Sequence, residues 1–178
     1  MQASDFVQFE RELWGREPFD WLVRLAKEMC CGRMPPALSI PTACGKSSCI
    51  DAAVFALAIQ ADSPNRTAPL RIQHVVDRRI VVDDVYAAAC KIASALDSSS
   101  QGVLGEVARR LRSFGGERPL ECCRLRGGVP RQVFPVLSPV QPTVLVSTVD
   151  QAGSAALFRS YYGSNRAAPV HAGLSMTD

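Results

Sequence analysis

Apolar residues recur along the chain at helical spacing in some segments and as short continuous runs in others. Near the N-terminus, two amphipathic runs, over residues 6–14 and after Pro18, have the apolar spacing of α-helices. The pair Pro35-Pro36 is expected to end the second helix, because proline cannot continue it. We therefore expect a helical N-terminal region over residues 1–36 and a second region over residues 37–178.

The second region alternates short apolar runs with helical ones. The short runs predict strands over residues 37–40, 70–76, 120–126 and 143–148. The helical runs cover residues 48–59, 81–96 and 103–114, and Asp150 is placed to cap a short helix through Phe158. Strands that alternate with helices predict an α/β fold, with a mostly parallel sheet and helices on both faces.

The segment Pro41-Thr42-Ala43-Cys44-Gly45-Lys46-Ser47 joins the first expected strand to the helix that follows it. Strand, Gly-Lys-Ser loop and helix, in that order, are the context of a phosphate-binding loop, although Ile40 replaces the first glycine of the usual pattern. In such a loop the lysine reaches the β- and γ-phosphates, and the serine hydroxyl binds Mg²⁺. We therefore expect a nucleotide–Mg²⁺ site at Thr42, Ala43, Cys44, Gly45, Lys46 and Ser47, with Ser47 as the metal ligand. A plain strand–turn–helix corner is the alternative.

Asp83 and Asp84 follow an apolar run and resemble the acidic strand end that holds Mg²⁺ in phosphate-loop enzymes. Only about three residues separate that run from the strand expected at 70–76, whereas parallel neighbours need a crossover of about a dozen. The helical spacing also continues past Asp84. We therefore place both carboxylates in the first turn of a helix and assign no catalytic residue.

The composition is typical of a soluble globular protein, with 47% hydrophobic residues, 21% charged residues and a net charge of +3. Neither a membrane span nor a signal sequence is recognisable, so a cytoplasmic location is expected. The seven cysteines form no Cys-x-x-Cys pair and there are only two histidines, which argues against a metal site. Several cysteines lie in apolar runs, where a reduced thiol acts as a small hydrophobic residue. Arg109, Arg110 and Arg112 are expected on a solvated helix face rather than in a nucleic-acid patch.

Six segments occur in an order that is similar to one known family. They are Pro18-Phe19-Asp20-Trp21, the loop from Pro41 to Ser47, His74 to Asp83, Leu125-Arg126-Gly127-Gly128, Thr148 to Ser154, and Pro169 to Leu174. The chain resembles the first RecA-like domain of the CRISPR-associated helicase–nuclease of type I systems, particularly subtype I-U, also called I-G. The resemblance spans nearly the whole chain.

This resemblance implies an ATP- and Mg²⁺-dependent helicase motor of superfamily 2, similar to DEAD/DEAH-box proteins. Such a motor moves along single-stranded DNA that a CRISPR RNA-guided surveillance complex has exposed. The resemblance implies that Phe19 and Trp21 belong to the nucleotide site, and that Leu22 stands where members usually carry a glutamine that reads adenine. It also implies a DNA-facing set: Arg78, Arg79, Gly127, Gly128, Thr148 and Gln151.

The chain ends about where the strand leading to the Asp-Glu-Ala-His box would begin, and no HD nuclease motif is present. The second RecA-like domain and the HD nuclease domain are therefore expected as partners. We expect a motor fragment that binds ATP and Mg²⁺ but hydrolyses ATP negligibly alone. Two alternatives stay open: a fragment of another superfamily 2 helicase, such as a restriction translocase or an RNA helicase, and a non-catalytic remnant that binds nucleotide or DNA.

Overall fold

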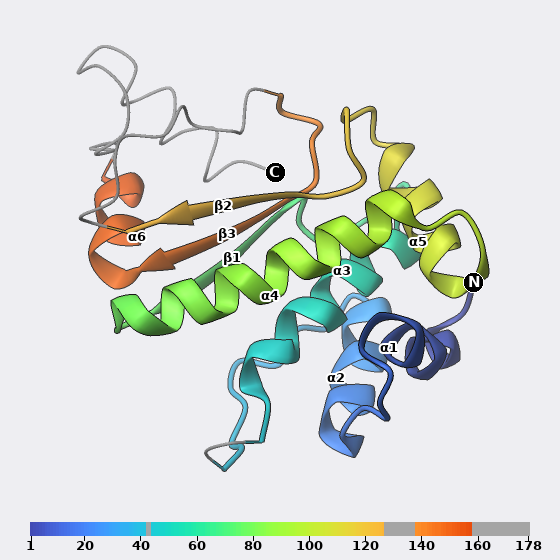
Figure 1. Cartoon of the computed structure of the whole chain (residues 1–178), viewed down its shortest axis with the longest axis horizontal. Helices are drawn as coiled ribbons and strands as arrows, with labels where there is room; N and C mark the ends of the chain where they lie inside the picture. The colour runs from blue at the N-terminus through green and yellow to red at the C-terminus, as the bar shows by residue number, and fades with distance from the viewer. Residues whose placement is uncertain (42–43, 127–137, 158–178) are drawn as a thin grey trace.

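The N-terminal region is helical, as the apolar spacing predicts. The computed structural model describes residues 1–41, 44–126 and 138–157, and its elements are shown in Figure 1. A short 3₁₀ turn (Ala3–Asp5) leads into α1 (Phe6–Trp14), and α2 (Asp20–Cys30) follows. α1 ends at Gly15, whose left-handed conformation (φ 69°) closes the helix through a hydrogen bond from its N–H to the Arg11 carbonyl.

Within the described residues the sheet has three parallel strands, in the spatial order β1–β3–β2. Their bounds are β1 (Arg71–Val76), β2 (Glu121–Leu125) and β3 (Thr143–Thr148). Thr143 pairs with Arg71 on one side and with Glu121 on the other, so the three strands begin level with one another. The predicted α/β class and the predicted parallel pairing are confirmed. The carboxyl ends of all three strands consequently lie at one edge of the sheet.

Helices pack against this sheet and against each other. α4 (Arg79–Ser98) crosses one face of the sheet and contacts all three strands (Figure 1). α6 (Val149–Ala156) follows β3 directly and contacts β3 and β1, while α5 (Gly102–Arg112) packs against α1, α3 and α4. The order of helices and strands after residue 48 therefore follows the predicted alternation.

α3 (Cys49–Ile59) lies at the centre of the hydrophobic core. Each of its residues from Ile50 to Ala58 is buried. The ring centroid of Phe55 lies 5.3 Å from that of Phe6 and 5.4 Å from that of Phe9, so α1 is joined to α3 by an aromatic cluster. The N-terminal helices and the sheet share one continuous core as a result.

The strand expected over residues 37–40 is absent, and this prediction is wrong. Residues 37–39 are exposed and have no regular structure. The run is short, and the prolines that flank it, Pro36 and Pro41, have no N–H with which to join a sheet ladder. The loop that follows is therefore not anchored by a strand.

Asp83 and Asp84 lie in a helix, as expected, but not in its first turn. α4 begins at Arg79, so both carboxylates belong to the second turn. The difference arises because the helix starts directly after β1, with Arg78 in an extended conformation as the cap residue. Their position one turn further on brings Asp83 to the end of β2.

Candidate nucleotide site

The loop ahead of α3 turns at a glycine in the left-handed conformation. Gly45 has φ 69°, and a Cβ atom placed there would lie 3.3 Å from Cε2 of Phe19. Both facts favour glycine at this position, because other residues adopt positive φ at a cost and would press on the ring. Lys46–Ser48 form a 3₁₀ turn, closed by a hydrogen bond of 2.9 Å from the Ser48 N–H to the Gly45 carbonyl. Thr42 and Ala43 lie outside the described residues.

Two aromatic residues at the start of α2 contact this loop. Trp21 Nε1 donates a hydrogen bond to the carbonyl oxygen of Cys44, at 3.2 Å. The ring of Phe19 packs against Gly45 and is 50% exposed. The structure thus brings together two predicted parts of the nucleotide site that lie more than twenty residues apart in the sequence.

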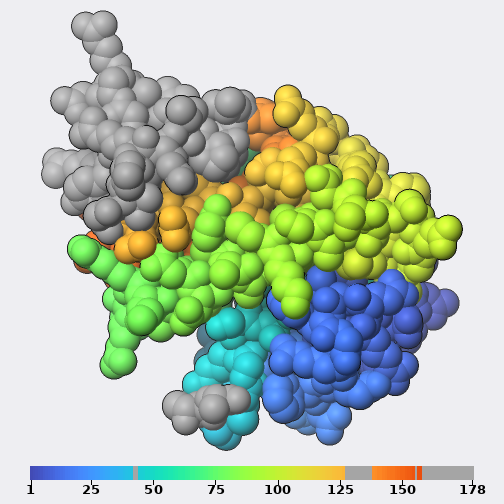
Figure 2. Space-filling view, in the orientation of Figure 1, coloured from blue at the N-terminus to red at the C-terminus, as the bar shows by residue number. Residues whose placement is uncertain are grey.

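Lys46 and Ser47 are exposed, and they lie where α3 begins. The loop lies at one end of the molecule, away from the sheet, beside the blue N-terminal helices (Figures 1 and 2). Lys46 and Ser47 could therefore meet a phosphate group and a Mg²⁺ ion from solvent, and backbone N–H groups at a helix N-terminus favour anions.

Leu22 cannot contact a nucleotide base in this arrangement. Its side chain is only 2% exposed and belongs to the core between α2 and its neighbours. Phe19, the cap residue of α2, is half exposed beside Gly45, and Arg24 is exposed further along the helix. A stacked base would fit Phe19, whereas position 22 offers no hydrogen bond.

A buried pair of carboxyl groups lies behind the loop, and the sequence interpretation missed it. Glu10 on α1 is 1% exposed and Asp51 in the first turn of α3 is 2% exposed. Trp14 Nε1 donates a hydrogen bond of 3.2 Å to Asp51 Oδ2, and the side chain of Ser48 is also hydrogen-bonded to Asp51. The available signals were one carboxylate within the apolar run of α3 and another on the apolar face of α1.

Only some of the predicted DNA-facing residues lie close to one another. Val76 pairs with Thr148 in the register of β1 and β3, so Arg78 and Arg79 follow one strand end while Gln151 follows its neighbour. Arg78 and Arg79 are exposed, and the Arg78 guanidinium lies 3.9 Å from the Asp77 carboxylate. Thr148 is buried in this arrangement, whereas Gly127 and Gly128 lie outside the described residues.

A cluster of two arginines and one aspartate marks the end of β2. Arg124 Nη1 and Arg126 Nε each lie 2.8 Å from Oδ1 of Asp83, and the Arg124 guanidinium stacks 5.0 Å from the ring centre of Tyr86. Asp83 therefore joins α4 to β2 through ion pairs. This role accounts for a carboxylate that resembled a metal ligand in the sequence.

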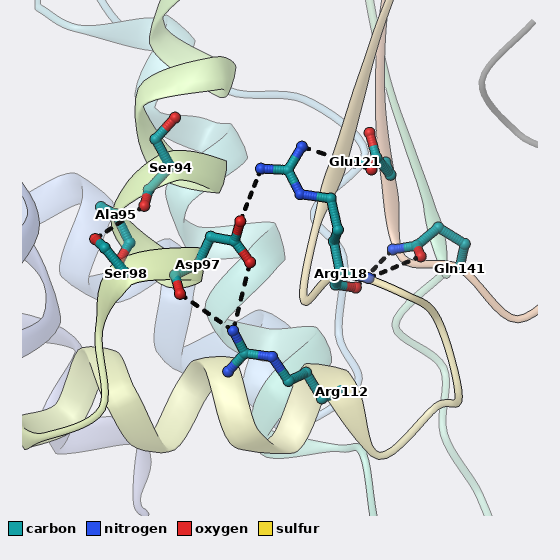
Figure 3. A network of polar contacts seen from close by, with 8 residues as sticks. All are labelled: Ser94, Ala95, Asp97, Ser98, Arg112, Arg118, Glu121 and Gln141. Atoms are coloured by element: carbon teal, nitrogen blue, oxygen red, sulfur yellow. Dashed lines mark hydrogen bonds and ion pairs between the residues drawn. The ribbon is translucent and has the colours of Figure 1, made fainter.

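The basic face of α5 is occupied by ion pairs. Arg109 and Arg110 both bind Glu106. Arg112 and Arg118 both bind Asp97, with Arg118 Nη2 at 2.9 Å from Oδ2, and Figure 3 shows this network at the end of α4. Because these arginines already have carboxylate partners, α5 is a poor candidate for a nucleic-acid surface.

The seven cysteines form no disulfide in the structure. Burial raises the pKa of Cys30 to about 12, since a thiolate in an apolar surrounding loses its hydration, and burial likewise raises the pKa of Cys123 to about 12. Both thiols are therefore protonated and poor nucleophiles at neutral pH.

The described part of the chain contains no cluster of three or more side chains of the metal-binding kinds. Ser47 is the single predicted ligand for Mg²⁺, and in phosphate-loop sites the nucleotide itself supplies further oxygen ligands. Over the same residues, every helix is too short or too polar to cross a lipid bilayer.

Comparisons of the chain with family models, with curated proteins and with solved structures find no match.

Proposed function

We propose that this chain is the first RecA-like motor domain of a CRISPR-associated helicase–nuclease, or a fragment of that domain, and that it binds ATP with Mg²⁺ and single-stranded DNA. The observation that carries the proposal is the contact of Phe19 and Trp21 with Cys44 and Gly45. It places an exposed aromatic ring beside a glycine turn at the N-terminus of a helix, which suits a base and its phosphates.

In this proposal different residues of the chain bind the phosphates, the Mg²⁺ ion and the base. The N–H groups of the turn and the Lys46 ammonium group hold the phosphates, the Ser47 hydroxyl contributes to holding Mg²⁺, and Phe19 stacks against the base. Within the described residues no strand is followed directly by two carboxylates. We therefore expect binding without efficient hydrolysis, because the acidic groups that hold Mg²⁺ and the attacking water are missing from this site.

A non-catalytic nucleotide- or DNA-binding remnant is the second candidate. The absence of a strand over residues 37–40 favours it, since a loop that no strand anchors holds its N–H groups less rigidly. The two candidates differ in whether a partner domain restores ATP hydrolysis.

Equilibrium titration with a fluorescent ATP analogue and Mg²⁺ tests the proposal. Lys46→Ala is expected to weaken binding by about tenfold or more, because a hydrogen bond to a charged group contributes about 1.5–3 kcal/mol. Lys27→Ala is the matched control, since Lys27 is an exposed lysine of α2. Equal binding by the two variants would contradict a phosphate site at Lys46. Rapid hydrolysis that only Lys46→Ala abolishes would contradict a site that binds without turnover.

A further inference from the structure

Glu10 and Asp51 form a buried pair of acidic groups with too few hydrogen-bond donors for two charges. Glu10 lies one helical turn before Trp14 on α1, and Trp14 donates to Asp51, so the two buried carboxyl groups lie at the same contact between α1 and α3 and interact there. Trp14 and Ser48 donate to Asp51, but Glu10 Oε1 receives no hydrogen bond from any donor within the described residues. Two carboxylates in contact cannot hydrogen-bond each other unless one of them carries a proton.

We propose that Glu10 and Asp51 share one proton at neutral pH. This protonated pair holds α3 against α1 and positions Ser48, the last residue of the 3₁₀ turn that also contains Lys46 and Ser47. The proton supplies the donor that the buried oxygens lack. The inference does not rest on nucleotide binding.

The surroundings of the pair favour one negative charge over two. Burial raises the pKa of Glu10, and burial together with the neighbouring Glu10 carboxyl raises the pKa of Asp51 well above its ordinary range. One negative charge has favourable partners, because the Trp14 and Ser48 donors and the positive end of α3 lie at Asp51. A second negative charge would be repelled by the first inside the core, where little water screens it.

None of the other charged or titratable groups described around the pair takes the place of the proton as a partner for the buried carboxyl oxygens. Arg16 acts on Glu10 from the loop after α1, and Lys91 Nζ of α4 lies 4.6 Å from the ring centre of Trp14. The Cys49 thiol on α3 has its pKa raised by burial, so it stays neutral. The charged side chains of α2 are exposed or ion-paired, and those of α5 form ion pairs with carboxylates.

The shared proton makes the stability of the fold depend on pH in a definite direction. In the unfolded chain the two carboxyls titrate near their ordinary pKa values of 4.5 and 3.8, whereas in the folded chain the proton is held to higher pH. The stabilisation is therefore complete below the unfolded values, and it is lost as pH rises through the raised pKa of the pair. As pH rises above the ordinary carboxyl pKa values, the melting temperature of the native chain is expected to fall relative to that of a variant in which an amide replaces one of the two carboxyls.

Glu10→Gln and Asp51→Asn test the proposal, because each amide supplies a permanent N–H donor and removes one titrating group. The melting temperature of each variant, minus that of the native chain, is expected to increase from about pH 5 to about pH 8. Glu117→Gln, which changes an exposed carboxylate, is the control and is expected to show a constant difference. A constant difference for Glu10→Gln and Asp51→Asn as well would overturn the proposal.

If Glu10→Gln or Asp51→Asn prevents folding, infrared spectroscopy of the native chain tests whether the pair carries a proton. The native chain at neutral pH is expected to show the C=O stretching band of a protonated carboxylic acid, which persists in Glu117→Gln. Absence of that band in the folded native chain at neutral pH would overturn the shared proton. Both measurements are made without nucleotide, so a failure to bind ATP would contradict the proposed function and leave this result unaffected.

Discussion

At the scale of single residues, the contact between Gly45 and Phe19 is the feature on which the candidate nucleotide site depends. Gly15 has the same backbone conformation, with φ 69°, but a Cβ atom there would meet no atom within 4 Å. Substitutions at the two glycines therefore distinguish the effect of backbone strain, which both share, from the effect of contact with the Phe19 ring, which only Gly45 has.

We predict that Gly45→Ala is more destabilising than Gly15→Ala and also alters the aromatic site. Each substitution places alanine at positive φ, which costs about 1 kcal/mol. Gly45→Ala additionally presses on the Phe19 ring and shifts the Cys44 carbonyl that accepts the Trp21 hydrogen bond. Thermal unfolding and Trp21 fluorescence measure the two effects. Equal losses of stability with unchanged fluorescence would show that the contact is unimportant.

Residue-level sequence patterns indicated the identities of the loop residues but not their surroundings. Phe19, Trp21 and Gly45 were predicted as one site, and the structure brings them together. The burial of Leu22 and the pairing of Glu10 with Asp51 depend on which helices pack together, and no local pattern reports that. A lone carboxylate in an apolar run is a usable signal for such pairs, since it must find a partner when buried.

At the scale of elements, α5 depends on a cap that comes from a distant helix. Its cap residue, Gln101, makes no side-chain capping bond. Instead the Glu12 carboxylate of α1 accepts hydrogen bonds from the N–H groups of Val103, at 3.3 Å, and Leu104, at 2.8 Å. This carboxylate satisfies two donors that a helix N-terminus leaves free, and it also faces the positive end of the helix dipole.

We predict that Glu12→Gln destabilises the chain by about 1 kcal/mol at neutral pH, the usual contribution of a cap. Burial alone would raise the pKa of Glu12, but the hydrogen bonds from Leu104, Gln8 and Val103 outweigh it and lower the pKa. The contribution is therefore present above the ordinary value of 4.5 and lost as pH falls through the lowered pKa, opposite to the Glu10–Asp51 pair.

The difference in melting temperature between the native chain and Glu12→Gln is accordingly expected to shrink on acidification. Glu17→Gln is the control, because Glu17 forms an exposed ion pair with Arg11 that contributes little. A difference that is independent of pH, or as large for Glu17→Gln, would contradict the charged cap.

Most elements were predictable from the spacing of apolar residues, and the one failure has a physical cause. The apolar start of α4 could have been taken for a strand. It was assigned to a helix because the connection after β1 is too short to join two neighbouring parallel strands. Residues 37–40 are apolar enough for a strand, but a strand also needs a neighbour with free hydrogen-bonding groups. That neighbour is set by tertiary structure, so a run of four residues could not decide it.

At the scale of the whole molecule, the N-terminal helices are integral to the fold. α1 contributes Phe6 and Phe9 to the cluster around Phe55 of α3, and it also carries the buried Glu10. The sequence pattern separated residues 1–36 from the rest at the paired prolines, which mark the end of a helix. The continuous core shows that this boundary divides the chain by sequence pattern and not by packing.

The DNA surface in the proposed function lies at the edge of the sheet where β1 and β3 end. Four arginines lie at or near the strand ends, but Asp83 already binds Arg124 and Arg126. Arg78 and Arg79 are the candidates for phosphate contacts, because both are exposed and the ion pair of Arg78 with Asp77 is long, at 3.9 Å, and open to solvent. Exposed guanidinium groups bind phosphates without regard to base sequence, and the binding weakens as salt rises.

We predict that replacing both Arg78 and Arg79 with glutamine weakens the binding of single-stranded DNA and lowers its salt dependence. With two phosphate contacts removed, the slope of log K against log salt is expected to fall in magnitude by about 1.4, since each contact contributes about 0.7 for a single strand. Replacing Arg109 and Arg112 with glutamine makes the same change in charge at arginines that are already ion-paired. Equal effects of the two double variants would mean that only net charge matters, and an unchanged slope for Arg78 and Arg79 would remove this edge as the DNA surface.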